Sequence, residues 1–125
     1  MSATVLLIDD DKDLGQMLQD ALSHSGFKTL FVQDGPAGLE VLQDQPVDLV
    51  LLDLMLPGVD GWEICRRVRE FSDVPIMIVT GNATEKLIEE AGVLGACKVM
   101  YKPVQLEEFV NSLATTLVDR ENKHA

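Results

Sequence analysis

VDLVLLDLMLPGVDG, at Val47–Gly61, is the segment around which the chain is organised. Its mostly apolar first half reaches Asp53 and then gives way to Pro57–Gly58 and Asp60–Gly61. An apolar run this short is typical of a strand buried on both faces, as in the middle of a parallel sheet. Ligands of open α/β sheets bind beyond the carboxyl ends of the strands. The segment therefore predicts a central strand that ends in a candidate functional acid, Asp53.

Further strand and helix signals alternate along the chain. Short apolar runs predict other strands at Thr4–Ile8, Phe27–Val32, Val74–Thr80 and Cys97–Tyr101. Apolar residues at helical spacing predict helices over Leu14–Leu22, Leu39–Leu42, Ile64–Phe71, Leu87–Ala91 and Leu106–Leu117. Because crossovers between parallel strands are right-handed, this alternation predicts a doubly wound α/β fold with helices on both faces of the sheet. We expect one domain over residues 1–120 and a polar tail, residues 121–125, that frays.

The composition narrows the class of protein. With 125 residues, of which 46% are apolar, the chain is long enough to form one compact core. A formal net charge of −11 repels nucleic acid phosphates and anionic lipids, so direct binding to nucleic acid or to membranes is not expected. Cys65 and Cys97 lack the spacing of a disulfide framework or a zinc site, and no apolar stretch suits a bilayer. We expect a cytoplasmic protein.

Polar residues follow four of the predicted strands. Asp9 and Asp10 follow the first strand, Asp53 ends the third, Thr80 ends the fourth and Lys102 follows the fifth. Parallel strands bring their carboxyl ends to one edge of a sheet, so these side chains should converge. Clustered carboxylates repel one another unless a cation joins them, and hard oxygen ligands with room for water favour Mg²⁺. A lysine and a hydroxyl beside that metal would suit a phosphoryl group.

Each of these residues also has a plainer explanation when it is taken singly. Acids after a strand often cap the following helix, and Asp11 or Asp13 could do so here. Thr80 suits a turn, and Lys102 suits a solvated surface position. The joint pattern at several strand ends favours the phosphoryl site over coincidence.

Four segments of the sequence occur together in a characteristic order. They are IDDDKDLG at Ile8–Gly15, LLDLMLPGVDGWE at Leu51–Glu63, VPIMIVTG at Val74–Gly81 and YKP at Tyr101–Pro103. In this order they resemble the signature segments of the receiver domain of bacterial two-component response regulators. The resemblance covers nearly the whole chain and implies a flavodoxin-like fold of five parallel strands, in the order 2-1-3-4-5, with five helices.

The resemblance also implies roles for the residues at the strand ends. Asp53 would be the phosphoacceptor, taking a phosphoryl group from a phosphohistidine of a sensor kinase or a phosphotransfer protein. Asp9 and Asp10 would hold Mg²⁺ together with the carboxylate of Asp53 and the backbone carbonyl of Met55. Lys102 would pair with the phosphoryl oxygens, aimed by a cis peptide bond before the following proline.

Other positions would respond to phosphorylation or set the rate at which the phosphoryl group is hydrolysed. Thr80 would turn inward to the phosphoryl group, and Met55 and Asn82 stand where the family tunes hydrolysis. The family usually has an aromatic residue three positions before the lysine, where this chain has Val99. Tyr101 instead adjoins the lysine, and strand alternation puts it on the same side as Val99, so the aromatic role would shift to Tyr101.

The implied partners are a histidine kinase or phosphotransfer protein and an unknown downstream protein. The chain would act as a monomer or as a dimer that forms on phosphorylation, with no catalysis beyond its own phosphorylation and dephosphorylation. It ends soon after the fifth predicted helix, and both a stand-alone receiver and one domain of a larger regulator or hybrid kinase fit the sequence.

Two other classes of function stay open. A phosphorylation-independent interaction module could share the fold, although it would not need the full set of site residues. A phosphohydrolase of the haloacid dehalogenase type also forms an aspartyl phosphate. Such enzymes place a second acid two residues after the nucleophile, where this chain has Met55, and this disfavours the enzyme.

Overall fold

The computed structural model describes residues 3–54, 56, 61–81, 89–90, 92–93 and 95–124, with side chains except at 96, 97 and 119–124. One five-stranded sheet has the order β2-β1-β3-β4-β5, and every neighbouring pair of strands is parallel. The strands are β1 (Thr4–Ile8), β2 (Lys28–Val32), β3 (Leu49–Asp53), β4 (Ile76–Thr80) and β5 (Ala96–Tyr101). The described helices are α1 (Lys12–His24), α2 (Gly35–Asp44), α3 (Gly61–Arg69) and α5 (Leu106–His124). The predicted fold class and strand order are confirmed.

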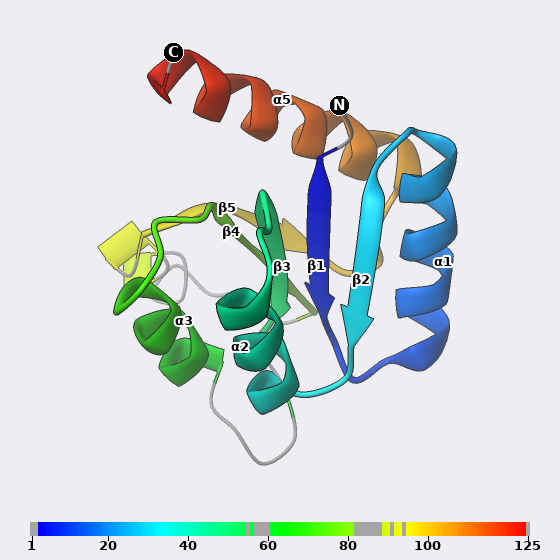
Figure 1. Cartoon of the computed structure of the whole chain (residues 1–125). Coiled ribbons are helices and arrows are strands. Elements are labelled where there is room, and N and C mark those ends of the chain that lie inside the picture. The colour runs from blue at the N-terminus through cyan, green and yellow to red at the C-terminus, as the bar shows by residue number, and fades with distance from the viewer. Residues whose placement is uncertain are drawn as a thin grey trace.

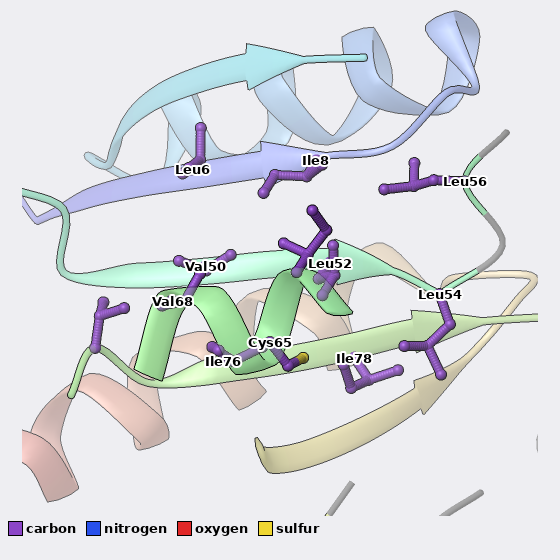
Figure 2. Close-up of a cluster of buried hydrophobic side chains, with 12 residues drawn as sticks. Leu6, Ile8, Val50, Leu52, Leu54, Leu56, Cys65, Val68, Ile76 and Ile78 are labelled. Atoms are coloured by element: carbon purple, nitrogen blue, oxygen red, sulfur yellow. The ribbon is translucent and has the colours of Figure 1, made fainter. Parts of the chain in front are cut away.

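Helices cover both faces of the sheet, with α1 and α5 on one side and α2 and α3 on the other (Figure 1). Alternate residues of β3 enter two separate apolar clusters. Val50 and Leu52 join the cluster under α2 and α3, while Leu49 and Leu51 join the cluster under α1 and α5. Figure 2 shows the first cluster, in which strand side chains meet those of α3. The central strand is thus buried on both faces, as its apolar sequence predicts.

Short-range hydrogen bonds fix where the first two helices begin. The side chain of Asp11 accepts a hydrogen bond from the backbone N–H of Leu14 at 3.0 Å, which caps α1. The side chain of Asp34 does the same for α2, accepting from the N–H of Ala37 at 2.8 Å. The plainer explanation is therefore confirmed for Asp11 as a helix cap.

Some predicted element boundaries differ from the structure. Phe71 lies beyond the end of α3 and is 43% exposed, so its predicted place in the helical stripe was wrong. The helix ends two residues earlier, and the N–H of Phe71 then bonds the carbonyl of Val68 in a turn. Of the predicted fourth helix, Leu87–Ala91, the structure describes only residues 89 and 90, which are helical, and the other three lie outside the described residues. Helix α5 continues to His124, and the boundary at residue 120 with its fraying tail stays a prediction.

Among the helices in the described part of the chain, none has both the length and the apolarity needed to cross a membrane.

Arg69, the last residue of α3, ties three segments together. Its guanidinium donates to the carbonyls of Ser72 at 3.3 Å, Val74 at 2.7 Å and Gly95 at 2.9 Å. Arg69→Ala should lower the free energy of unfolding by about 2 kcal/mol, because three carbonyls, two of them in partly buried hydrogen bonds, lose a charged donor. Arg66→Ala on the same helix, which loses only an exposed ion pair with Glu63, should change it by about 0.5 kcal/mol or less. Urea unfolding of both variants tests the difference, and equal losses would contradict it.

Candidate functional site

The ends of the parallel strands bring five polar residues to the same edge of the sheet. Asp9 and Asp10 follow β1, Asp53 ends β3, Thr80 ends β4 and Lys102 follows β5. Asp9, Asp53 and Thr80 are buried, whereas Asp10 is exposed. The structure therefore brings together the acids and the lysine that the sequence singles out, with one acid open to solvent.

The three acids form a group that suits a metal ion. Carboxylate oxygens of Asp9, Asp10 and Asp53 all lie within 4.8 Å of one another. Three hard, negatively charged oxygen ligands match the preference of Mg²⁺, and the exposed position of Asp10 leaves room for the waters that this ion keeps. The residues present thus fit a magnesium site. Met55, expected to add a backbone carbonyl, lies outside the described residues.

Lys102 bridges the two buried acids. Its Nζ lies 3.2 Å from Oδ2 of Asp9 and 3.2 Å from Oδ2 of Asp53. Its backbone N–H donates to the carbonyl of Thr80 at 2.8 Å, which fixes the chain at the end of β5 against the end of β4. The peptide bond between Lys102 and Pro103 is cis, as the resemblance implies. One ammonium group thus faces two buried carboxylates, and the site keeps a surplus of negative charge.

The pKa values reflect this imbalance of charge. Burial raises the pKa of Asp9 above its ordinary value of 3.8, the backbone N–H of Asp11 opposes the rise, and repulsion from Asp53 adds to it. Burial by itself would lower the pKa of Lys102, but the attraction of Asp9 and Asp53 outweighs burial and raises that pKa. Lys102 therefore stays charged at neutral pH, while the negative charge of Asp9 disfavours the folded state.

Neutralising Asp9 should stabilise the protein when no divalent cation is present. Because its pKa is raised on folding, the folded protein binds the proton of Asp9 more tightly than the unfolded chain does, so ionised Asp9 lowers stability at pH 7. Asp9→Asn should therefore raise the urea midpoint in EDTA at pH 7. The gain should fade as the pH falls toward 3.8 and be absent below it, where Asp9 is protonated in both states.

Millimolar Mg²⁺ should remove this advantage, because wild type gains the stability of the bound ion and Asp9→Asn loses a ligand. Glu40→Gln, which removes an exposed acid from α2, is the control for a simple change of net charge. A lower urea midpoint for Asp9→Asn in EDTA, or equal stabilisation of both proteins by Mg²⁺, would contradict the prediction.

The residues expected to read the site lie on β4 and β5. Thr80 pairs in register with Tyr101, and Ile78 pairs with Val99 two residues earlier. Val99 is partly buried against the cluster under α2 and α3, whereas Tyr101 is 52% exposed. Tyr101 thus lies on β5 next to Thr80 of β4. The switch roles of Thr80, Val99 and Tyr101 stay predictions. Asn82, expected to tune hydrolysis, lies outside the described residues.

One supporting contact was missed by the sequence reasoning. Oδ1 of Asp9 accepts a hydrogen bond from the backbone N–H of Asp11 at 2.9 Å, so Asp11 both caps α1 and orients an acid of the site. The run of acids at Asp9–Asp11 contains the signal, because a carboxylate commonly bonds the backbone two residues further on. The remaining acid of the run, Asp10, is exposed and belongs to the same group of three acids.

Comparison with known proteins gives consistent matches. The family model of the response regulator receiver domain matches residues 5–114. The transcriptional regulatory protein BaeR of Escherichia coli O6:H1 is 38% identical over 114 residues, which cover 90% of this chain and 47% of BaeR. The response regulator receiver protein CpdR of Brucella abortus is 34% identical over 115 residues, which cover 91% of this chain and 96% of CpdR.

Similarity to solved structures extends over the whole fold. The crystal structure of a CheY-like response regulator receiver domain protein from Methanospirillum hungatei matches with a TM-score of 0.93 and 21% sequence identity. The match covers 98% of this chain and 99% of that chain. This chain spans about half the length of BaeR, 47%, and the same share of YrkP from Bacillus subtilis.

Proposed function

This chain belongs to the response regulator receiver domain family, and we propose that it is a phosphorylation-controlled signalling switch with Asp53 as the phosphoacceptor. The observation that carries the proposal is the position of Lys102 Nζ, 3.2 Å from both Asp9 and Asp53. A phosphoryl group attached to Asp53 would meet this ammonium group directly. Asp10 completes the acidic group on the exposed side.

The proposed chemistry is transfer of a phosphoryl group to a carboxylate oxygen of Asp53. The new bond forms between that oxygen and phosphorus, and the bond from phosphorus to a histidine nitrogen of the donor protein breaks. Bound Mg²⁺, held by Asp9, Asp10, Asp53 and the carbonyl of Met55, would supply positive charge for the phosphoryl oxygens. Lys102 would balance the remaining charge through its ammonium group.

The proposed response begins at Thr80. Its hydroxyl would donate a hydrogen bond to the phosphoryl group and so favour one of two conformations of the end of β4. Tyr101, its partner in register on β5, would take over the aromatic role that the family usually gives to the position of Val99. The surface that changes would include β5 and α5, where a downstream protein would bind.

The proposal also covers the partners of the chain, its place in the cell and the lifetime of the acyl phosphate. A histidine kinase or phosphotransfer protein of the cytoplasm would supply the phosphoryl group, and the chain would act as a monomer or as a dimer formed on phosphorylation. Met55 and Asn82 would tune hydrolysis of the acyl phosphate. Output would pass through protein contacts, because a net charge of −11 disfavours direct contact with DNA.

Phosphate uptake from acetyl phosphate tests the proposal. In millimolar Mg²⁺ the intact mass should rise by one phosphate, and EDTA should prevent the rise. Absence of uptake by the folded wild-type protein would contradict the proposal and favour the phosphorylation-independent interaction module. Steady turnover of an external phosphoester would instead favour the phosphohydrolase.

A further inference from the structure

Gly61, the first residue of α3, lies against the backbone of the residue that follows Asp53. A Cβ atom at Gly61 would come within 2.7 Å of Cα and 3.0 Å of the carbonyl oxygen of Leu54, and within 2.9 Å of its Cδ2. Ordinary van der Waals contacts begin at 3.4 Å, so any side chain here would force the two segments apart by about 0.7 Å. The helix can start this close to the end of β3 only because the residue lacks a side chain.

The helix side of this contact is firmly held. Ile64, Cys65 and Val68 of α3 are buried at 1%, 0% and 0% exposure in the cluster that also contains Leu54. A shift of α3 would open gaps in this packing, which is costly in a close-packed core. Much of the displacement would therefore fall on Leu54 and on the peptide bond that joins it to Asp53.

We propose that Gly61 is a positioning residue that sets the carboxylate of Asp53 relative to Asp9, Asp10 and Lys102. The expected effect on phosphate uptake rests on the proposed function. The expected effect on Mg²⁺ binding rests only on the group formed by Asp9, Asp10 and Asp53. Displacements well below 1 Å weaken both a metal site and an in-line reaction, because each depends on the directions and distances of several groups at once. The effect of a side chain at Gly61 should therefore exceed what lost stability alone would cause.

Gly38 of α2 provides a matched control at another strand end. A Cβ atom there would press on Cδ1 of Ile8 and come within 2.9 Å of its Cγ1. Ile8 directly precedes Asp9, as Leu54 directly follows Asp53, and both glycines are buried. The difference is that a Cβ atom at Gly38 would press only on side-chain atoms of Ile8, whereas at Gly61 it would also press on the backbone of Leu54.

Two measurements on fully folded protein test the proposal, with urea unfolding used to choose conditions in which every variant is folded. Calorimetric titration gives the Mg²⁺ dissociation constant, and intact mass gives the rate of phosphate uptake from acetyl phosphate at saturating Mg²⁺. Gly61→Ala should weaken Mg²⁺ binding about tenfold and slow uptake about tenfold or more. Gly38→Ala should stay within about twofold of wild type in both, although it too loses stability.

The double variant Leu54→Ala/Gly61→Ala separates the backbone contact from the side-chain contact and is titrated under conditions in which urea unfolding shows that it is folded. It removes the contact with Cδ2 but keeps the approach to Cα and the carbonyl oxygen, so weak Mg²⁺ binding should persist. Restored Mg²⁺ binding in the double variant would overturn the proposal. So would equal losses of Mg²⁺ affinity in Gly61→Ala and Gly38→Ala, or a wild-type protein that binds no Mg²⁺. If wild type binds Mg²⁺ but takes up no phosphate, the proposed function fails while the titration still decides on Gly61.

Discussion

Asp53→Asn should give a folded protein that takes up no phosphate from acetyl phosphate, with a rate at least about a hundredfold below wild type. The amide keeps the shape of the buried side chain but removes the nucleophilic oxygen. It also removes one of three carboxylates that lie within 4.8 Å of one another, so stability in EDTA should be equal to or above that of wild type. Intact mass and urea unfolding measure the two effects.

Asp13→Asn is the matched control for this variant, because it makes the same change in net charge at an exposed acid in the first turn of α1. It should take up phosphate at the wild-type rate. Uptake that survives in Asp53→Asn would move the phosphoacceptor to another residue. Uptake lost together with the folded state would mean that the variant tested stability rather than chemistry.

Lys102→Met should lower the free energy of unfolding by about 2 kcal/mol in EDTA and slow phosphate uptake about tenfold or more. The ammonium group lies 3.2 Å from each of two carboxylates, and without it Asp9 and Asp53 face each other with no balancing charge. The loss should be smaller than for a fully buried ion pair, because 24% of the lysine side chain is exposed. Millimolar Mg²⁺ should restore most of the lost stability by supplying positive charge to the same acids.

Lys98→Met is the control for loss of a lysine from β5. Its Nζ donates to the hydroxyl of Ser112 at 2.9 Å and has no part in the site, so the stability change should be below about 1 kcal/mol and independent of Mg²⁺. An equal loss for Lys102→Met with and without Mg²⁺ would show that its packing matters rather than its charge. Repulsion between Asp9 and Asp53 would then not be what Lys102 relieves.

The central strand and the edge that bears the site could be predicted from sequence because few alternatives fit. A short apolar run such as Leu49–Leu52 is typical of a strand buried on both faces of a sheet, and parallel strands then place the polar residues that follow them at one edge. Asp9, Asp53 and Lys102 converge because the strands run in the same direction, and not because of any contact within one segment.

Details that depend on contacts between distant segments were beyond the sequence. The neighbours Asp9 and Asp10 look equivalent in the sequence. In the structure, however, the backbone N–H of Asp9 donates to the carbonyl of Val32 on β2 and its side chain is buried, whereas Asp10 is exposed. The stripe that included Phe71 continued past the true end of α3, because periodicity does not reveal where the chain turns. The close approach of Gly61 to Leu54 was hidden because a glycine after an aspartate also reads as a plain turn.

Locating the phosphoryl group on the chain tests Asp53 as the phosphoacceptor most directly. Borohydride reduces an aspartyl phosphate to homoserine, which marks the modified position for peptide mass spectrometry. After treatment with acetyl phosphate and Mg²⁺, homoserine is expected at position 53 and at no other aspartate of the chain. Homoserine at Asp9 or Asp10, or a phosphate retained on a histidine, would contradict the assignment of Asp53 as the phosphoacceptor.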